Sequence, residues 1–261
     1  MERRLVTAAA EEFPAFVRPL VEGAQLYDSS CCSGAKVWFV DRDGGYYLKQ
    51  APAGTLEKEA VLTRFFHQKG LAAKVLGYES GAWDWLLTAR IPGEDCIFPA
   101  YLEDPRRLCD TTAQLLRMLH ETDHRGCPVP DRTSDYLREA EANHRRGMCD
   151  INLFSDRWKL GSAEEAWDEL ARNGRYLKRD VLLHGDYCLP NIMLEDWNFT
   201  GFVDLGAGGV GDRHVDLLWG MWTLEFNLKT DAWEERFLDA YGRDAVNMDA
   251  FRTVTAVEIF T

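Results

Sequence analysis

The sequence lacks the features that would assign it to a membrane, to a disulfide-stapled scaffold or to a zinc site. No apolar run approaches the ~18 residues that a membrane-spanning helix needs. Glu11 and Glu12 interrupt the basic start before the apolar core of a signal peptide can develop. The 7 cysteines are an odd number without a CxxC pair, so neither a disulfide framework nor a zinc site is indicated. These absences predict a cytoplasmic protein without a membrane partner.

Positive charge is also scarce. Lysine and arginine together number 30 against 43 aspartates and glutamates, which gives a formal net charge of −13 at pH 7. Binding of nucleic acid through a basic face is therefore not expected. The excess of carboxylates would steer a cationic ligand toward the protein, although solubility alone also explains it. Hydrophobic residues make up 46% of the 261 residues, enough for a core in one large domain or in two lobes.

The stretch 184–191, with the sequence HGDYCLPN, lies between short apolar runs that are typical of buried strands. Residues 181–183 predict one such strand. Residues 192–194 and 201–203 predict a hairpin across the polar turn at 195–198. The polar residues of the stretch are therefore expected on a loop that buried strands hold in place.

The predicted hairpin brings an amide and a carboxylate together at its open end. If Ile192 pairs with Val203, Asn191 and Asp204 lie opposite each other, roughly 4.5–5.5 Å apart. Such oxygens suit Mg²⁺, which completes its octahedron with phosphate oxygens and water. Asp186, on the adjacent loop, could accept the proton of a hydroxyl group, as phosphoryl transfer requires. Asp and Asn are also common turn residues, but three of them at the ends of apolar runs favour the catalytic interpretation.

The first third of the chain is rich in strand signals. A strand is predicted at 35–40, and its return strand at 46–49 ends in Lys49. A helix is predicted from Glu57 to Lys69, and on it Glu59 shares the apolar face. An unpaired carboxylate that faces a core is costly, so Lys49 and Glu59 are expected to pair rather than to form two separate surface charges.

After a further strand at 82–88, the chain changes character. Pro92 and Gly93 mark the best lobe boundary, and strand signals nearly vanish over most of the remainder. Helices are expected at 104–121, 133–147, 163–177, 217–228, 233–241 and 254–260. A strand-rich first third and a helical remainder predict an α+β protein with one domain at 1–91 and a second at 92–261.

Two motifs resemble those of a known family. His-Gly-Asp-x-x-x-x-Asn at 184–191, followed by Asp-Leu-Gly at 204–206, resembles the catalytic loop and metal motif of the aminoglycoside phosphotransferases, relatives of the protein kinases. The stretches 188–193 and 201–204 are most similar to the 3′-phosphotransferases that confer kanamycin and neomycin resistance. The resemblance extends from about Tyr27 to the last residues. It implies a two-lobed, protein-kinase-like fold with a small β-rich N-lobe for the nucleotide and a larger, mainly helical C-lobe for catalysis and substrate.

The resemblance also implies a kinase that uses ATP and Mg²⁺. Asn191 and Asp204 would hold the metal, and Lys49, paired with Glu59, would bind the α- and β-phosphates. Tyr47 matches a tyrosine that stacks on adenine, although packing in the core is a competing interpretation. The other positions that match nucleotide contacts are Ser33, in the loop over the phosphates, and the backbone of Ala89 and Ile91, at the hinge.

The implied reaction transfers the γ-phosphate of ATP to the 3′-hydroxyl of an aminoglycoside, a cationic small molecule, and would confer resistance. Asp186 would orient the hydroxyl and accept its proton, and Glu258 would contact an amine of the substrate. Ala207 and Trp222 replace two family arginines, which leaves open kinases of the same fold for choline, macrolides, fructosamine or another metabolite. An inactive nucleotide-binding sensor is a third interpretation, which the intact Lys49 and Asp186 disfavour. A monomer or a weak dimer is expected.

Overall fold

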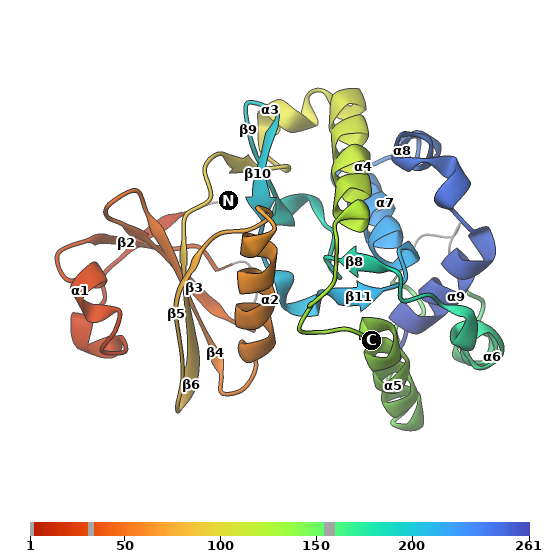
Figure 1. Ribbon diagram of the computed structural model, residues 1–261, viewed down its shortest axis with the longest axis horizontal. Coiled ribbons are helices and arrows are strands. Elements are labelled where there is room, and N and C mark those ends of the chain that lie inside the picture. The colour runs from red at the N-terminus through yellow and green to blue at the C-terminus, as the bar shows by residue number, and fades with distance from the viewer. Residues whose placement is uncertain (1–2, 31–33, 154–159) are drawn as a thin grey trace. The chain divides into compact units, whose positions relative to one another are not determined.

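The chain forms two compact units, one rich in strands and one helical (Figure 1). The computed structural model describes residues 3–30, 34–153 and 160–261. The first unit contains Met1–Phe98 and Pro190–Gly206, and the second contains Pro99–Leu189 and Ala207–Thr261. This division differs from the predicted one between residues 91 and 92, because a strand beyond that point pairs with the returning segment of the first unit. The predicted α+β class is confirmed.

A six-stranded antiparallel sheet is the basis of the first unit (Figure 1). In spatial order its strands are β1 (Arg4–Val6), β2 (Gln25–Asp28), β3 (Lys36–Asp41), β4 (Tyr46–Pro52), β6 (Trp83–Ala89) and β5 (Val75–Ser80). Leu48 of β4 is fully buried and is aligned with Trp38 of β3 and Leu87 of β6. Because successive side chains of a strand point to opposite faces, Lys49 lies on the other side of the sheet. The alternation therefore places the ammonium group of Lys49 on the face of the sheet that points away from the aromatic core.

Each face of this sheet packs against its own partner. On one face, Phe13 meets Trp38 edge to face with ring centroids 5.4 Å apart, and Trp38 stacks on Trp85 at 5.8 Å. The short helices η1 (Ala10–Glu12) and α1 (Arg18–Val21) belong to the N-terminal segment that supplies Phe13. On the other face lies α2 (Glu57–Gln68), whose Ala60 is fully buried in a cluster with residues of β4 and β6. The first turns of α2 are thus presented to the Lys49 side of the sheet.

A second, smaller sheet completes the first unit. Its order is β10-β9-β7, and its strands are β10 (Asn198–Phe202), β9 (Ile192–Glu195) and β7 (Glu94–Asp95). Ile192 pairs with Phe202, so the predicted pairing of Ile192 with Val203 is wrong by one residue. The strands are joined by a two-residue turn, Asp196 and Trp197, with φ of +50° and +67°, and one bulge follows in β10. The turn and the bulge together set a register that hydrophobic spacing alone does not specify.

Helices dominate the second unit, and the short antiparallel strands β8 (Val181–Leu183) and β11 (Gly209–Gly211) lie among them (Figure 1). The helices are α3 (Pro99–Leu102), α4 (Pro105–Glu121), α5 (Arg132–Arg145), α6 (Ala163–Asn173), η2 (Gly174–Tyr176), α7 (His214–Leu228), α8 (Glu234–Tyr241), η5 (Arg243–Ala245) and α9 (Met248–Glu258). The helix α7 is largely buried, and its Leu217 and Met221 have no exposed surface. Asp104 caps α4 by accepting a hydrogen bond from an amide of the first turn (3.1 Å).

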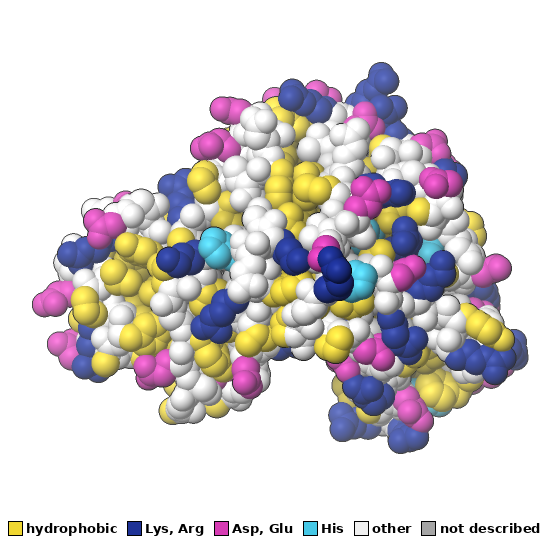
Figure 2. Space-filling view, viewed as in Figure 1, with side chains coloured by type: hydrophobic (Ala, Val, Ile, Leu, Met, Phe, Trp, Pro, Cys, Tyr) yellow, Lys and Arg dark blue, Asp and Glu magenta, His cyan; other side chains and the backbone are white. Residues whose placement is uncertain are grey.

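Charged side chains of both signs are interspersed over the face of the second unit that Figure 2 shows. Several of them pair, such as Arg172 with Asp168 within α6 (2.9 Å) and Arg243 of η5 with Asp239 of α8 (2.8 Å). Exposed pairs of this kind contribute little to stability, so the helices are held mainly by their buried faces. In the described ranges, no helix combines the length and the apolar character that a membrane span requires.

Candidate functional site

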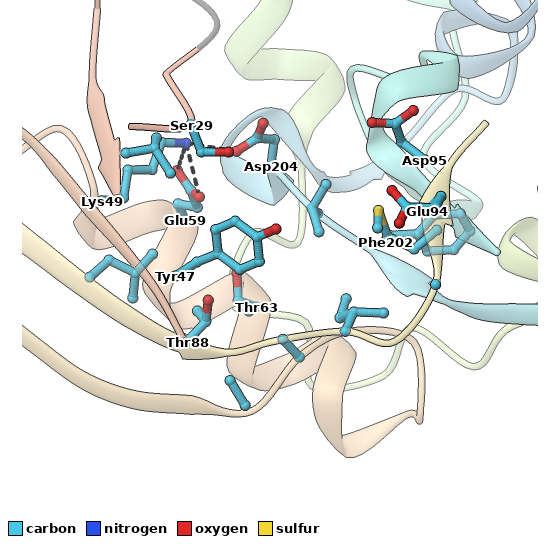
Figure 3. Close-up of a pocket in the computed structure, with 18 of the residues that line it drawn as sticks. Ser29, Tyr47, Lys49, Glu59, Thr63, Thr88, Glu94, Asp95, Phe202 and Asp204 are labelled. Atoms are coloured by element: carbon cyan, nitrogen blue, oxygen red, sulfur yellow. Dashed lines mark hydrogen bonds and ion pairs between the residues drawn. The ribbon is translucent and has the colours of Figure 1, made fainter. Parts of the chain in front are cut away.

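An ion cluster forms around Lys49 on the α2 side of β4 (Figure 3). Its Nζ atom lies 2.8 Å from Oε2 and 3.1 Å from Oε1 of Glu59. The same atom lies 2.8 Å from Oδ1 of Asp204. The predicted contact between Lys49 and Glu59 is therefore present, and Asp204 joins it from the segment that follows β10. A strand, a helix and a hairpin of the first unit thus meet at one ammonium group.

The three charges of the cluster alter one another's protonation. Burial acts to lower the pKa of Lys49, but the charges of Asp204 and Glu59 outweigh it and raise that pKa above its ordinary value. Burial raises the pKa of Glu59, and the ammonium of Lys49 opposes this rise. The lysine is therefore charged throughout the neutral range, beside one buried carboxyl and one carboxylate, Asp204, whose side chain is 42% exposed.

Asp204 has a backbone conformation that is uncommon for residues other than glycine, with φ at +57°. Such a conformation persists where the surrounding structure imposes it, and it is frequent at functional sites. The amide of Val203 donates to the carbonyl of Asn191 (3.1 Å). Val203, and not Asp204, therefore lies opposite Asn191, because the hairpin register is shifted by one residue from the predicted one.

The ion cluster forms one end of a pocket in the first unit (Figure 3). Its walls come from β4, β6, the segment after β6 and the small sheet, and Glu94 and Asp95 lie at its other end. The largely apolar walls include Val37, Tyr47, Leu86, Ile91, Met193 and Phe202. A flat apolar ring that carries an anionic group fits this arrangement, with the ring between the walls and the anion at Lys49.

Of the predicted nucleotide-binding residues, Tyr47, Ala89 and Ile91 line this pocket together with Lys49 and Glu59. The remaining one, Ser33, lies outside the described residues. Tyr47 is not solely a core residue, since its hydroxyl accepts a hydrogen bond from Nη2 of Arg3 (2.7 Å) at the pocket wall. Arg3 therefore belongs to the site although it stands far from the other residues in the sequence.

In the second unit, the loop after β8 carries the partly buried Asp186. A fully buried carboxylate, Asp216 of α7, holds this loop in place. It accepts hydrogen bonds from the amides of His184 (2.8 Å) and Gly185 (2.7 Å). The Nε2 atom of His120, on α4, lies 3.2 Å from the same carboxylate. Asp216 thus fixes the backbone from which Asp186 projects.

Two further contacts stiffen this network. Nδ1 of His120 lies 2.8 Å from the hydroxyl of Tyr241. Burial lowers the pKa of His120, although the charge of Asp216 acts to raise it, so the imidazole is neutral near pH 7 and serves as a hydrogen-bonding link. Gly185 has φ at +83°, and a Cβ atom there would lie 2.2 Å from the carbonyl oxygen of Ala207. Only glycine fits at that position of the loop.

An arginine of α5 contacts the backbone of Ala207. Nε of Arg132, in the first turn of α5, donates to the carbonyl of Ala207 (3.0 Å). Its guanidinium lies over the ring of Tyr136, 3.6 Å from the centroid. The hydroxyl of Tyr136 donates to the carbonyl of Gly185 (3.1 Å). The helix α5 therefore connects residue 207 to the loop that carries Asp186.

Glu258, the predicted substrate contact, is buried at the end of α9 with 6% of its surface exposed. Its Oε2 accepts a hydrogen bond from Oγ1 of Thr261 (3.3 Å), whereas Oε1 has no hydrogen-bonding partner within the described part of the chain. Burial raises the pKa of Glu258 to about 7, and the Thr261 hydroxyl and the charge of Arg132 oppose the rise. An ammonium group that reached this carboxyl would stabilise its charged form.

Known proteins that resemble this chain define its family. Residues 29–252 match the phosphotransferase enzyme family. A probable aminoglycoside 3′-phosphotransferase of Lactococcus lactis subsp. lactis is 43% identical over 96% of this chain and 95% of its own. The chain belongs to the phosphotransferase enzyme family. An aminoglycoside 3′-phosphotransferase of Streptomyces ribosidificus is 31% identical to this phosphotransferase over 83% of this chain and 88% of its own.

Solved structures of aminoglycoside phosphotransferases share the fold of this phosphotransferase. The aminoglycoside-3′-phosphotransferase of type VIII matches with a TM-score of 0.74 at 26% identity, over 96% of each chain. The enzyme APH(3″)-Id of Streptomyces rimosus, in complex with ADP and streptomycin, matches with a TM-score of 0.70 at 26% identity, over 87% of this chain and 90% of its own. The predicted kinase-like fold and the predicted transfer of phosphate to a hydroxyl group are thus confirmed.

Sequence reasoning missed three residues at or beside the site of this phosphotransferase. For Asp216 a signal existed, because a carboxylate inside the apolar segment 214–228 requires buried partners. Arg132 and Arg3 gave no such signal, since both stand among polar residues and their partners lie far away in the sequence. These two were found only through the packing of distant elements.

Proposed function

We propose that this phosphotransferase transfers the γ-phosphate of ATP to the 3′-hydroxyl of an aminoglycoside. The observation that carries the proposal is the ammonium of Lys49 at the end of an apolar pocket, held by Glu59 and Asp204 at 2.8 Å from each. A lysine in this setting suits the α- and β-phosphates of a nucleotide. The relatives support the acceptor, because several are named aminoglycoside 3′-phosphotransferases and the APH(3″)-Id structure holds ADP and streptomycin.

The adenine ring would lie between the walls of the pocket, beside Tyr47. The amide of Ala89 already donates to the carbonyl of Lys74 (2.9 Å), so we expect Ala89 to contact the adenine amine through its carbonyl oxygen. Ile91 would provide the next main-chain contact along the base. Ser33 would contact the phosphates. Because ATP is made and used in the cytoplasm, we place the reaction there.

Mg²⁺ fits the donors that the first unit offers. Asp204 has a partly exposed carboxylate, and Asn191, which is 7% exposed, would contribute an amide oxygen. Mg²⁺ uses few protein oxygens and completes its shell with phosphate oxygens and water, so these two residues are a sufficient protein contribution. When bound, the ion would neutralise charge on the β- and γ-phosphates. The ion cluster has two carboxyl groups, those of Glu59 and Asp204, and only one ammonium group, that of Lys49. This excess of acidic groups also favours binding of a cation.

Asp186 would act on the acceptor. Its carboxylate would orient the hydroxyl group and take the proton as the hydroxyl oxygen bonds to the γ-phosphorus and the bond to the leaving ADP oxygen breaks. The buried Asp216 would keep the loop of Asp186 in place during this step. Glu258 would receive an ammonium group of the substrate at its unpartnered oxygen.

The proposed reaction is tested with purified protein, Mg·ATP and a panel of aminoglycosides. We expect kanamycin- or neomycin-type compounds to consume ATP and to yield a phosphate ester at the 3′-oxygen, identified by ³¹P and ¹H NMR. The matched 3′-deoxy compounds should bind but give no product. If choline or a macrolide stimulated ATP turnover and no aminoglycoside did, the acceptor would be wrong and the kinase assignment would stand.

Substitution of Asp186 should separate catalysis from nucleotide binding. For Asp186→Asn we expect a loss of about 10²–10⁴ in kcat, the usual effect of losing a general base, with the Kd for ATP almost unchanged. Steady-state kinetics and calorimetric titration with ATP measure the two quantities. The control is Asp168→Asn, which alters an exposed aspartate of α6 and should leave both near their wild-type values. A wild-type rate in Asp186→Asn would show that this residue has another role.

A further inference from the structure

One side of α7 carries three aromatic side chains in a row. Trp219 and Trp222 meet edge to face with ring centroids 5.3 Å apart. Trp222 stacks on Phe226 with centroids 5.1 Å apart and an interplanar angle of 13°. Phe226, at the outer end of the row, is 55% exposed. The spacing i, i+3, i+7 therefore places the three rings in one row, from the half-buried Trp219 to the exposed Phe226.

A hollow opens beside the outer end of this row. It is lined by Trp222, Glu225, Phe226, Lys229, Thr230 and Asp231. Two carboxylates, Glu225 and Asp231, thus stand beside an exposed aromatic ring. Carboxylates and aromatic faces both attract ammonium groups, whereas the phosphates of a nucleotide would be repelled here. The two carboxylates, set against the single ammonium group of Lys229 in the lining, favour a cationic occupant that packs on the aromatic rings.

The ring of Phe226 already holds an ammonium group in this structure. Nζ of Lys229 lies 4.3 Å from the centroid of that ring. Lys229 immediately follows α7 and is exposed. Because a long exposed side chain can move aside at little cost, an ammonium group of a ligand could take its place.

The inner end of the row leads to a second acidic group. Trp219 lies within reach of the carboxyl group of Glu258. The Oε1 atom of Glu258 has no hydrogen-bonding partner in the portion of the chain that the structure describes. Acidic groups therefore stand at both ends of the aromatic row, as recognition of a molecule with several ammonium groups requires.

We propose that Trp222 and Phe226 form a platform on which an amino-sugar ring of the aminoglycoside stacks, with Glu225 and Asp231 receiving an ammonium group of that ring. The inference rests on the proposed function and identifies the residues that select the substrate. The C–H face of a sugar ring and its ammonium groups both pack favourably on aromatic faces.

The platform is tested by comparing Phe226→Ala with the wild type in the phosphorylation of a neomycin- or kanamycin-type compound. We expect the KM for the aminoglycoside to rise roughly 5- to 30-fold, with kcat and the KM for ATP within about twofold of wild type. Phe226→Leu keeps an apolar side chain without a π-face and should also raise the KM. Phe226→Trp should restore it. Thermal melting of each variant checks that the fold is intact.

Tyr176→Ala provides the matched control. Tyr176 is also an exposed aromatic residue of the second unit (66%), and the guanidinium of Arg175 lies 4.7 Å from its ring centroid. It therefore has the same combination of ring and cation, but it does not line the hollow. We expect its kinetic constants to equal those of the wild type.

The outcomes separate the two proposals. Unchanged KM for the aminoglycoside in both Phe226→Ala and Phe226→Leu would overturn the platform and leave the proposed reaction intact. Absence of turnover by the wild type with every aminoglycoside would overturn the proposed reaction and the platform with it. A changed sedimentation coefficient in Phe226→Ala, without a change in KM, would assign this face of α7 to self-association and would also overturn the platform.

Discussion

The two units of this phosphotransferase use a carboxylate in opposite ways. In the first unit, Asp204 shares one ammonium group with Glu59 and keeps 42% of its side chain exposed. In the second unit, Asp216 is fully buried and is occupied by two main-chain amides and by His120. The first arrangement leaves charge that a ligand can share, whereas the second uses its oxygens to hold a loop. Exposure, and not residue type, distinguishes a binding group from a supporting one.

The largest effect is expected from removing the supporting carboxylate. Asp216→Ala would leave the amides of His184 and Gly185, and also His120, without their acceptor in a dry interior. The free energy of unfolding should fall by roughly 3–5 kcal/mol, with loss of activity. Asp204→Ala is the matched variant, and we expect it to weaken Mg·ATP binding and turnover while its melting temperature stays near that of the wild type. Equal losses of melting temperature in the two variants would contradict the contrast between the units.

A smaller effect is expected within the partly buried ion cluster, where Lys49 and Glu59 should be energetically coupled. A double-mutant cycle of the alanine variants should give a coupling of about 0.5–3 kcal/mol in the free energy of unfolding, because Lys49→Ala leaves the buried carboxyl of Glu59 without its partner. Lys49→Ala should also raise the KM for ATP. The control cycle uses the exposed pair Arg172 and Asp168, for which we expect about 0.2–1 kcal/mol. If the effects of the two single variants on the free energy of unfolding were strictly additive, the contact between Lys49 and Glu59 would contribute nothing to stability.

A further effect depends on pH and involves Glu258. Its pKa is raised by burial to about 7 in the folded protein, above the ordinary 4.5 of the unfolded chain. Its contribution to stability is therefore complete below about pH 4.5 and is lost as the pH rises through about 7. Glu258→Gln, which cannot ionise, should gain stability relative to the wild type over this window, by at most about 3 kcal/mol. Calorimetry at pH 5 and pH 8 measures the difference, and a constant difference would mean that Glu258 ionises freely.

Local signals were sufficient for most helices. Leucine spacing with Asp104 and Pro105 at the start predicted 104–121, and α4 spans Pro105–Glu121. The start of α7 was predicted at residue 217, but the helix begins at His214. His214 is buried by tertiary contacts, and its polar side chain gave no sign of this burial in the sequence. Propensity and periodicity thus located elements better than their ends.

Pairing across the sequence was harder to predict. Lys49 and Glu59 could be paired because each is a charged residue in an apolar context, which leaves few alternatives. The register of the β9–β10 hairpin could not be fixed, since it depends on the positive φ of Asp196 and of Trp197, and a bulky residue such as tryptophan rarely adopts such a value. The loop support by Asp216 depends on a helix that follows the loop in the sequence, and only the folded chain brings the two together.

The first unit is not continuous in the chain, since Met1–Phe98 is completed only by Pro190–Gly206. During synthesis, β7 emerges from the ribosome long before β9, the strand with which it pairs. The growing protein must therefore leave one strand edge open while much of the second unit is made, which slows assembly and favours chaperone binding or aggregation. Until residue 204 has emerged, Lys49 has only Glu59 for a partner, so a stalled chain would carry an incomplete ion cluster.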